Sequence, residues 1–264
     1  MTIKLIAIDL DGTVVDHDLS ISPLVIEGLQ KAQRDYGCKV IIATGRMFPS
    51  TIQFADRIEN SNPIISYQGA MIRHKLEEKP MFHQGIDLST ARELISVIQD
   101  NNYHTNLYID DVLYTNFMNE KAWYYKSLTG VTPVHQPDLL EVLTKDPSKI
   151  MIIDEDCDAV MANLKSQFEG RIHICISRKD FCEIVHPDIS KWVAIEELLK
   201  LWNINASEVM AIGDQDNDIA MIEGAGIGVA MGNAPQHIKD RANFVTKSIK
   251  EDGVLHALNE FIFV

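Results

Sequence analysis

Short apolar segments alternate with helix-like segments at both ends of this 264-residue chain. The segment Val40-Ile41-Ile42-Ala43 is apolar throughout, which is typical of a strand buried on both faces of a parallel sheet. An alternation of this kind predicts an α/β fold in which helices cover both faces of such a sheet. The expected strands before residue 70 are 4–10, 39–43 and 64–66, and the expected helices are 22–36 and 49–59.

The middle of the chain follows a different pattern, in which helices are separated from pairs of adjacent strands. This segregation is typical of an α+β unit with an antiparallel sheet. We expect helices at 88–101, 119–129 and 158–168, hairpins at 106–115 and 171–185, and a strand at 149–154. The first pattern then returns, with helices at 190–201, through Met221 and at 254–261, and strands at 209–212 and 227–230. The sequence therefore predicts a Rossmann-like, doubly wound parallel-sheet core of residues 1–83 and 187–264, with residues 84–186 inserted as an α+β cap.

The composition excludes several classes of protein. The 24 Lys and Arg against 38 Asp and Glu give a formal net charge of −14, which argues against binding to nucleic acid or to an anionic membrane. No apolar run approaches the roughly 18 residues that span a bilayer, and the N-terminal run is too short for a signal peptide. The four cysteines include no Cys-x-x-Cys pair, so we expect buried thiols in a cytoplasmic protein. We expect this protein to be a monomer or a small homo-oligomer.

Two carboxylates, Asp9 and Asp11, follow the first apolar strand. Alternate residues of a strand point to the same side, so both can project into one cleft, at the strand end where open α/β sheets bind ligands. Gly12 and Thr13 allow the chain to turn directly afterwards. Two carboxylates so close repel each other, so one takes up a proton or a cation lies between them. Taken alone, the motif is more often an ordinary strand and turn.

The end of a second strand and the start of a later helix also carry groups suited to binding an anion. Thr44, Gly45 and Arg46 follow the strand at 39–43, where a hydroxyl and glycine N–H groups beside a helix N-terminus can form a phosphate nest. Lys191 lies at the start of a helix, where the helix dipole disfavours positive charge. We therefore expect Lys191 to pair with an anionic ligand or a carboxylate.

The most specific motif is Gly213-Asp214-Gln215-Asp216-Asn217-Asp218, which follows the strand at 209–212. A helix N-cap would need only one of its three carboxylates. Such a concentration of negative charge is costly unless a hard divalent cation organises it. Oxygen ligands in an incomplete cage, completed by waters and a substrate phosphate, suit Mg²⁺. The motif therefore predicts a magnesium site.

These groups together fit the cleavage of a phosphate ester, which requires charge neutralisation, in-line positioning and protonation of the leaving oxygen. Asp9 would attack phosphorus, and Asp11 would protonate the leaving oxygen and later activate water. Mg²⁺ and Lys191 would neutralise charge, while Thr44 and the Gly45 amide would hold the phosphate. The predicted function is a Mg²⁺-dependent phosphatase that hydrolyses a small phosphorylated metabolite, such as a sugar phosphate.

The motifs resemble those of the haloacid dehalogenase-like (HAD) phosphohydrolases, specifically the Cof-type branch with an inserted α/β cap of type IIB. The resemblance covers essentially the whole chain. Its four motifs correspond to residues 9–13, 44–46, 191 and 213–218, and residues 228–234 and 252–254 are also similar to that branch.

The resemblance implies that Asp9 forms an aspartyl-phosphate and that Asp11 is the general acid and base. It implies Mg²⁺ held by Asp9, Asp214 and the backbone carbonyl of Asp11, with Asp218 reaching the metal directly or through water. Phosphate contacts are implied for the backbone N–H of Leu10 and for Thr44, Gly45, Lys191 and Asn217, and substrate binding for Arg46.

Three residues depart from the family's pattern. Gln68 stands where the family usually has Asn and reaches further. Asp188 and Trp192 flank Lys191 where glycine or another small residue is common, so an indole could enter the cleft or pack beneath the cap. The cap is expected to set specificity and to close on hinges near Gly85 and Pro187. Polar or aromatic candidates on the cap are Tyr108, Asp110, Tyr114, His173 and Arg178.

Other functions use similar residues. A phosphotransferase or phosphomutase of the same fold would pass the phosphoryl group to a second hydroxyl if the cap excluded water. A receiver-like signalling domain also phosphorylates an aspartate near Mg²⁺, but it has the length of roughly one small domain and stores the phosphoryl group. A non-catalytic phosphate-binding relative is the remaining alternative.

Overall fold

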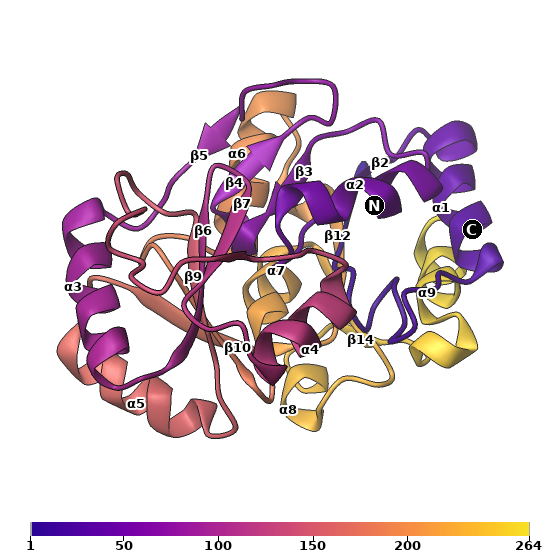
Figure 1. Cartoon of the computed structure of the whole chain (residues 1–264). Coiled ribbons are helices and arrows are strands. Elements are labelled where there is room, and N and C mark those ends of the chain that lie inside the picture. The colour runs from indigo at the N-terminus through magenta and orange to yellow at the C-terminus, as the bar shows by residue number, and fades with distance from the viewer. Residues whose placement is uncertain (1, 264) are drawn as a thin grey trace.

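The computed structural model describes residues 2–263 and contains two large β-sheets that lie side by side. Figure 1 shows the first and last segments of the chain together in the right-hand half, with the middle segments in the left-hand half. The parallel-sheet half is thus built from both ends of the chain, and the cap from the middle. This confirms the predicted fold class, while the boundaries at residues 83/84 and 186/187 stay predictions.

The parallel sheet has five strands, and the N-terminal strand β1 lies inside it, next to the edge strand β2. The hydrogen-bonded order is β14-β13-β12-β1-β2, and all four pairings are parallel. The bounds are β1 Leu5–Ile8, β2 Lys39–Ile42, β12 Val209–Gly213, β13 Ile227–Ala230 and β14 Phe244–Val245. Because β1 lies between β2 and β12, the residues that follow these three strands emerge at one edge of the sheet.

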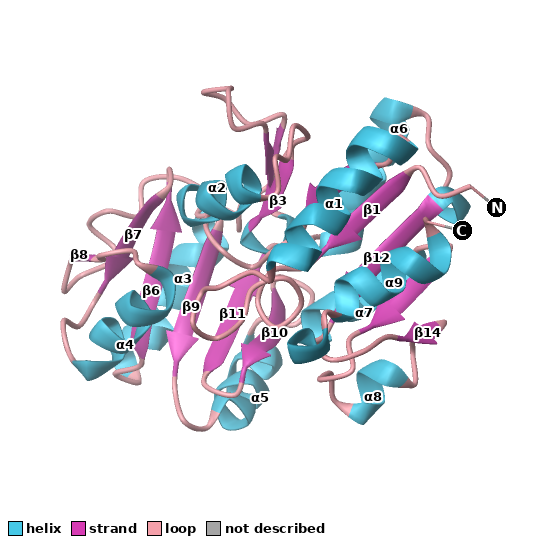
Figure 2. Ribbon diagram, turned by 90° about the vertical axis from the view of Figure 1, so that its right-hand side faces the viewer, coloured by secondary structure: helices cyan, strands magenta, loops and turns pink. Residues whose placement is uncertain are grey.

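Alternation of side chains along β1 sends apolar residues to both faces of the sheet. Ile6 and Ile8 belong to the apolar core shared with α1 (Pro23–Tyr36), α2 (Phe48–Arg57) and α9 (Gly253–Phe261). Leu5 and Ala7 belong to a separate core shared with α6 (Lys191–Trp202) and α7 (Ile219–Gly224). Figure 2 shows α1 and α9 lying across the parallel strands. Burial of both faces explains why these strands are apolar without interruption.

Helix α1 begins and ends close to the predicted positions. Pro23 occupies the first turn, where its missing N–H costs nothing, and Gly37 ends the helix with a φ of 65°. A residue with a side chain is disfavoured in that left-handed conformation. Ser22 occupies the N-cap position as expected, but its side chain makes no capping hydrogen bond.

The cap is a six-stranded sheet with the order β10-β11-β9-β6-β7-β8. Its strands are β6 His104–Ile109, β7 Val112–Thr115, β8 Val134–His135, β9 Lys149–Ile153, β10 His173–Arg178 and β11 Phe181–Val185. Helices α3 (Leu88–Asp100) and α5 (Cys157–Gln167) share an apolar core with one face, and α4 (Glu120–Thr129) contributes Tyr125 to the other face. Tyr108, Met151 and Phe181 on that second face share the core of the parallel-sheet half, so this face of the cap is directed toward the strand ends.

The segment after β3 (Ile64–Ser66) differs from the prediction of a further parallel strand. Directly after β2, a single parallel bridge joins Ala43 to Ile65 of β3, so the expected parallel direction is present but not extended into a strand pair. β3 pairs instead with β4 (Met71–Arg73), which pairs with β5 (Phe82–His83), in a small antiparallel sheet. The chain reverses here through left-handed backbone at Tyr67 and Gln68, a conformation that residue type alone did not indicate. The short helix α8 (Gln236–Lys239) was not predicted either.

The two links between core and cap contact neighbouring residues. A side chain at Gly85 would lie 2.8 Å from the carbonyl oxygen of Pro147, and Gln84 is hydrogen-bonded to His186 beside the other link. The proposed hinges near Gly85 and Pro187 stay predictions. All four cysteines are free, and Cys175 is the only one not fully buried. Within residues 2–263, no helix combines the length and the apolar composition of a membrane span.

We expect α1 to depend on its buried face. Leu29 is fully buried, whereas Leu24 on the same helix is 51% exposed. Leu29→Ala should lower the free energy of unfolding by about 2–5 kcal/mol, because it leaves a cavity beneath the helix. Leu24→Ala is the matched control and should change it by less than about 0.5 kcal/mol. Urea denaturation of both variants checks this, and equal losses would contradict the assignment of the buried face.

Candidate active site

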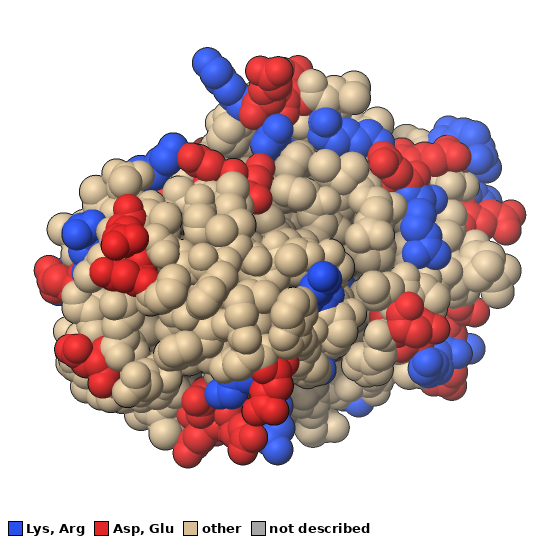
Figure 3. Space-filling model, viewed as in Figure 1, with Lys and Arg blue, Asp and Glu red and all other residues tan. Residues whose placement is uncertain are grey.

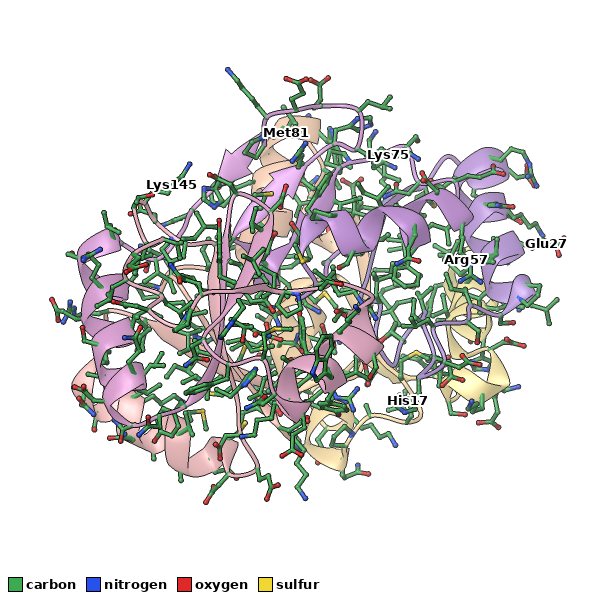
Figure 4. The ribbon with its side chains drawn as sticks, in the orientation of Figure 1. His17, Glu27, Arg57, Lys75, Met81 and Lys145 are labelled. Atoms are coloured by element: carbon green, nitrogen blue, oxygen red, sulfur yellow. The ribbon has the colours of Figure 1, made fainter. Side chains whose placement is uncertain are left out.

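A cleft of about 320 Å³ lies between the strand ends of the core and the cap. Its core side includes His17, which is labelled in Figure 4 on the loop that follows β1. Its cap side comes from α4 and from strands β9, β10 and β11. On the face drawn in Figure 3, charged side chains gather around the edge and uncharged residues cover the middle. The sequence-predicted residues that line the cleft are Asp9, Asp11, Thr44, Gly45, Arg46, Asp214 and Asn217.

Asp9 and Asp11 leave the end of β1 toward the same cleft but have different surroundings. Asp9 is buried, whereas the Asp11 side chain is 54% exposed. Both oxygens of Asp11 accept hydrogen bonds from the Arg46 guanidinium, at 2.7 and 2.6 Å. Gly12 has a φ of 87°, and a side chain there would lie 2.4 Å from the Asp214 carboxylate. The turn after β1 therefore requires glycine in order to bring the loop after β12 close to Asp9.

The loop after β12 holds its carboxylates with hydrogen bonds of its own. Asp214 accepts hydrogen bonds from the Thr13 hydroxyl at 3.0 Å and from the Gln215 amide at 2.9 Å. One oxygen of Asp218 accepts the backbone N–H groups of Asp214 and Gln215, at 2.9 and 3.0 Å. This arrangement leaves the second oxygen of Asp218 free to face another group.

Lys191 joins the two carboxylate-bearing loops. Its Nζ donates hydrogen bonds to Asp9 and to Asp218, each at 2.6 Å, and its side chain is completely buried. Helix α6 begins at Lys191, with the Ser190 hydroxyl capping the N–H of Val193. The predicted carboxylate partners of Lys191 are therefore present, and they offset the unfavourable position of a cation at a helix start. Lys191 and Asp218 are not among the residues that line the cleft, but both contact the cluster there, Lys191 through its bond to Asp9 and Asp218 through its bond to Lys191.

Burial makes the ionisation of this cluster unusual. Burial raises the pKa of Asp9 well above its usual value, against the opposing effect of Lys191. Burial and the nearby Asp218 raise the pKa of Asp214 to about 7. Burial alone would lower the pKa of Lys191, but Asp218 and Asp9 outweigh it, so that pKa is raised and the lysine stays charged. One ammonium cannot balance three ionised carboxylates, so in the metal-free site protons are held more tightly, and a bound cation would replace them.

The carboxylates of Asp9, Asp214 and Asp218 fit a hard divalent cation. One oxygen atom from each lies within 4.8 Å of the others, and all three residues are buried. Such a set of oxygen donors, with room for further ligands on the cleft side, suits Mg²⁺. The side chain of Asp11 belongs to a different contact, because both of its oxygens bind Arg46.

The turn at Thr44-Gly45-Arg46 lies beside the cluster, at the end of β2. The Thr44 hydroxyl accepts the N–H of Arg46 at 3.1 Å, and the Thr44 carbonyl accepts the N–H of Gln68 at 3.1 Å. Arg46 lines the cleft and is largely buried, and the substrate contact expected of it stays a prediction. Its guanidinium pairs with Asp11 and lies over the Phe54 ring, 4.9 Å from its centre.

The three departures from the family pattern have distinct positions. Trp192 packs against Gly224, on the α6–α7 side of the parallel sheet, so the expectation that its indole enters the cleft or lies beneath the cap is wrong. It is directed there because α6 turns the residue after Lys191 away from Asp9. The side chain of Asp188 is 81% exposed. Gln68 is buried and hydrogen-bonded to Asn217 at 3.0 Å.

Two charged residues of the site were missed by sequence reasoning. Lys149 and Glu183 lie on the cap strands β9 and β11, and they form a buried ion pair of 2.9 Å. Both line the cleft. Each is a lone charge inside an apolar strand, Lys-Ile-Met-Ile-Ile and Phe-Cys-Glu-Ile-Val. A charge in such a segment was the available signal, because burial of a charge requires a partner.

The cap residues named as specificity candidates are only partly in position. Arg178 lines the cleft, and its guanidinium donates to the Tyr124 hydroxyl at 3.1 Å. Tyr108 is buried and donates to the Tyr125 hydroxyl at 2.7 Å. Asp110 pairs with Lys145 at 2.5 Å. Of the five candidates Tyr108, Asp110, Tyr114, His173 and Arg178, only Arg178 borders the cleft.

Comparison with known proteins gives a consistent result. The family described as haloacid dehalogenase-like hydrolase matches residues 6–258. The chain is 33% identical over 267 residues to YxeH of Bacillus subtilis (strain 168), and the match covers 98% of each chain. It is 30% identical over 267 residues to YitU of the same organism, which is named a 5-amino-6-(5-phospho-D-ribitylamino)uracil phosphatase, and this match covers 97% of each chain.

A solved structure of known description has the same fold as this chain. The structure superposes on that of BT4131, described as a HAD subclass IIB sugar phosphatase, with a TM-score of 0.89. The superposition covers 99% of this chain and 100% of the other, at 23% sequence identity. At this identity the likeness concerns the fold, including the cap inserted into the parallel-sheet core.

We expect the metal-free protein to lose stability as the pH rises. The pKa of Asp214 is about 7 in the folded protein against an ordinary value of 3.8, so the folded state binds this proton more tightly than the unfolded chain. Its contribution is greatest below about pH 4 and is lost by about pH 7. Asp214→Asn should remove this part of the pH dependence. Urea denaturation between pH 5 and 8 in a chelator checks this, with Asp216→Asn as the exposed control.

We also expect Mg²⁺ to stabilise the folded protein, because a cation that binds only the folded state raises the unfolding midpoint. Millimolar Mg²⁺ should raise the thermal midpoint of the wild type and of Asp216→Asn, and should raise that of Asp214→Asn much less. Differential scanning fluorimetry with and without Mg²⁺ measures this. Equal shifts in all three proteins would contradict a site that includes Asp214.

Proposed function

Because the chain belongs to the haloacid dehalogenase-like hydrolases and is a phosphatase, we propose that it is a Mg²⁺-dependent phosphomonoesterase acting through an aspartyl-phosphate. The observation that carries this proposal is the cluster of Asp9, Asp214 and Asp218, with one oxygen of each within 4.8 Å of the others and the Lys191 ammonium bonded to Asp9 and Asp218. A negatively charged phosphate ester can enter such a site only if further positive charge accompanies it.

We assign the attack on phosphorus to Asp9. One of its oxygens accepts the hydrogen bond from Lys191, and the other has no hydrogen-bond partner among residues 2–263. An oxygen–phosphorus bond then forms at this second oxygen while the bond between phosphorus and the leaving oxygen breaks. Lys191 orients the carboxylate and offsets part of the charge that develops.

We assign the proton transfers to Asp11. Its carboxylate is at the cleft and is held by two hydrogen bonds from Arg46. In the first half-reaction the protonated Asp11 would donate its proton to the leaving oxygen. In the second, its carboxylate would take a proton from water, which attacks phosphorus and releases Asp9 and inorganic phosphate. Arg46 thus acts on the reaction by positioning Asp11.

Asp9, Asp214, Asp218 and the Asp11 backbone carbonyl would hold Mg²⁺, and the metal supplies the positive charge that draws the phosphate into the site. Thr44, Gly45, Lys191, Asn217 and the N–H of Leu10 would contact the phosphate oxygens. These groups lie on four different segments. They meet because β1, β2 and β12 end at one edge of the sheet and α6 begins beside it.

We propose a small phosphorylated metabolite as the substrate. A cleft of about 320 Å³ is at the lower limit of typical small-molecule sites, and the cap covers it. The similar protein YitU is named as a phosphatase of a phosphorylated ribityl compound. BT4131, which has the same fold, is described as a sugar phosphatase. A sugar phosphate or a related phosphomonoester agrees with both. We place the enzyme in the cytoplasm as a monomer or small homo-oligomer, with core residues 1–83 and 187–264 and cap residues 84–186.

The test is Mg²⁺-dependent release of inorganic phosphate from a panel of phosphomonoesters. Asp9→Asn should lower kcat by at least about a thousandfold, because the nucleophile is lost. Asp11→Asn should lower kcat by about 10²–10⁴-fold, because both proton transfers are lost. Asp35→Asn, an exposed aspartate on α1, is the control and should keep wild-type activity.

Equal phosphate release by the wild type and Asp9→Asn would overturn the nucleophile assignment. Transfer of phosphate to a second hydroxyl, with no free phosphate in the absence of that acceptor, would favour a phosphotransferase instead. Acid-quenched protein that retains labelled phosphate in Asp11→Asn, but not in Asp9→Asn, would support the covalent intermediate.

A further inference from the structure

A chain of hydrogen bonds runs from the buried ion pair of the cap to the loop that carries Asp218. Glu183 on β11 accepts a hydrogen bond from Lys149 at 2.9 Å and another from the Gln68 amide nitrogen at 3.0 Å. The Gln68 amide oxygen accepts a hydrogen bond from the Asn217 amide nitrogen at 3.0 Å. Lys149 also donates to the backbone carbonyl of Gly45 at 2.8 Å. The chain thus joins the cap to two segments proposed to bind phosphate.

The chemistry of these groups determines the direction of each amide. An ionised carboxylate accepts hydrogen bonds and donates none, so Glu183, paired with Lys149, must receive the NH₂ group of Gln68. The oxygen of Gln68 is then the end that faces Asn217. An oxygen accepts only, so Asn217 must turn its NH₂ group toward Gln68. The orientation of one amide therefore follows from that of the other.

The hydrogen bonding of Asn217 agrees with this direction of its amide. Its amide oxygen is buried and has no hydrogen-bond partner among the described residues, which is an unusual and costly state for a polar atom. Its amide nitrogen donates to Gln68 and keeps a second N–H group. Asn217 lines the same cleft as Asp9 and Thr44. The orientation that Gln68 imposes thus favours a donor, and disfavours an acceptor, toward an anionic ligand.

The backbone around Gln68 is built for this contact. Tyr67 and Gln68 have φ values of 52° and 61°, and non-glycine residues in that left-handed region are strained and concentrate at functional sites. A side chain at Gly45 would lie 2.3 Å from the Gln68 amide nitrogen and 3.3 Å from Glu183. Glycine at position 45 is therefore needed to let the Gln68 amide reach the cap.

From these observations we propose that Gln68 and Glu183 are positioning residues that orient the Asn217 amide so that it donates to the substrate's phosphate. The proposal rests on the proposed phosphatase function, in which Asn217 contacts phosphate. Because Glu183 belongs to the cap and Asn217 to the core, the orientation is imposed only when the cap is seated on the core. The longer Gln, where the family usually has Asn, spans the distance between these two groups.

Inorganic phosphate, as a competitive inhibitor in the presence of Mg²⁺, measures this site directly. Glu183→Gln replaces a pure acceptor with an amide that both donates and accepts, so it no longer dictates the direction of Gln68. Gln68→Met keeps the length of the side chain and removes the amide that binds both Glu183 and Asn217. Each variant should raise the inhibition constant of phosphate about tenfold, the effect of losing one hydrogen bond. Glu93→Gln, on the exposed face of the cap, is the isosteric control and should leave it unchanged.

A double-mutant cycle distinguishes positioning from a general structural effect. Asn217→Ala removes the amide that is oriented, so Glu183→Gln and Gln68→Met should each change the inhibition constant by less than about twofold in that background. Effects that remain tenfold and additive would overturn the proposal. If Glu183→Gln does not fold, since it leaves the buried charge of Lys149 without a carboxylate, the Gln68→Met cycle gives the decision alone.

The same measurements separate this proposal from the function on which it rests. Absence of Mg²⁺-dependent phosphate release by the wild type would overturn the phosphatase proposal. Calorimetric titration of inorganic phosphate with the same variants would still test the orientation of Asn217. An active wild type whose phosphate affinity is unchanged in Gln68→Met would overturn the positioning role and leave the phosphatase function intact.

Discussion

The two ion pairs of Lys191, with Asp9 and with Asp218, are the interaction on which the rest of the site depends. They join β1, the start of α6 and the loop after β12, three segments that are far apart in the chain. All three side chains are removed from water, so each pair is strong only while the other groups stay in place. The ammonium offsets part of the charge of the clustered carboxylates, and the excess that remains is what a divalent cation would balance.

A second polar arrangement connects this centre to the cap. The ion pair of Lys149 and Glu183 is buried at the face of the cap that meets the core. Lys149 donates a hydrogen bond to the backbone carbonyl of Gly45, and Glu183 accepts one from the Gln68 amide. The cap is therefore more than a cover over the cleft, because its own charges are completed by groups of the core. Placement of the cap and order of the phosphate site depend on the same few contacts.

The periodic parts of the fold could be predicted, and the irregular parts could not. Unbroken apolar segments such as 40–43 identified the buried parallel strands, and Gly37 identified the end of α1. The antiparallel pairing of β3 escaped prediction, because it depends on left-handed backbone at Tyr67 and Gln68, residue types that do not favour it. The position of Trp192 was also wrongly expected, since the direction of a helix face depends on its packing.

The sequence by itself determined which chemical groups stand at the ends of the strands, and with them the family and the class of reaction. Local spacing is sufficient for this, because a strand of alternating side chains can deliver Asp9 and Asp11 to one edge wherever the sheet is placed. Only the tertiary structure decided the partners: Arg46 for Asp11, two carboxylates for Lys191, and Glu183 for Gln68. These four pairs join residues 35, 182, 27 and 115 positions apart, distances over which a sequence carries no local signal.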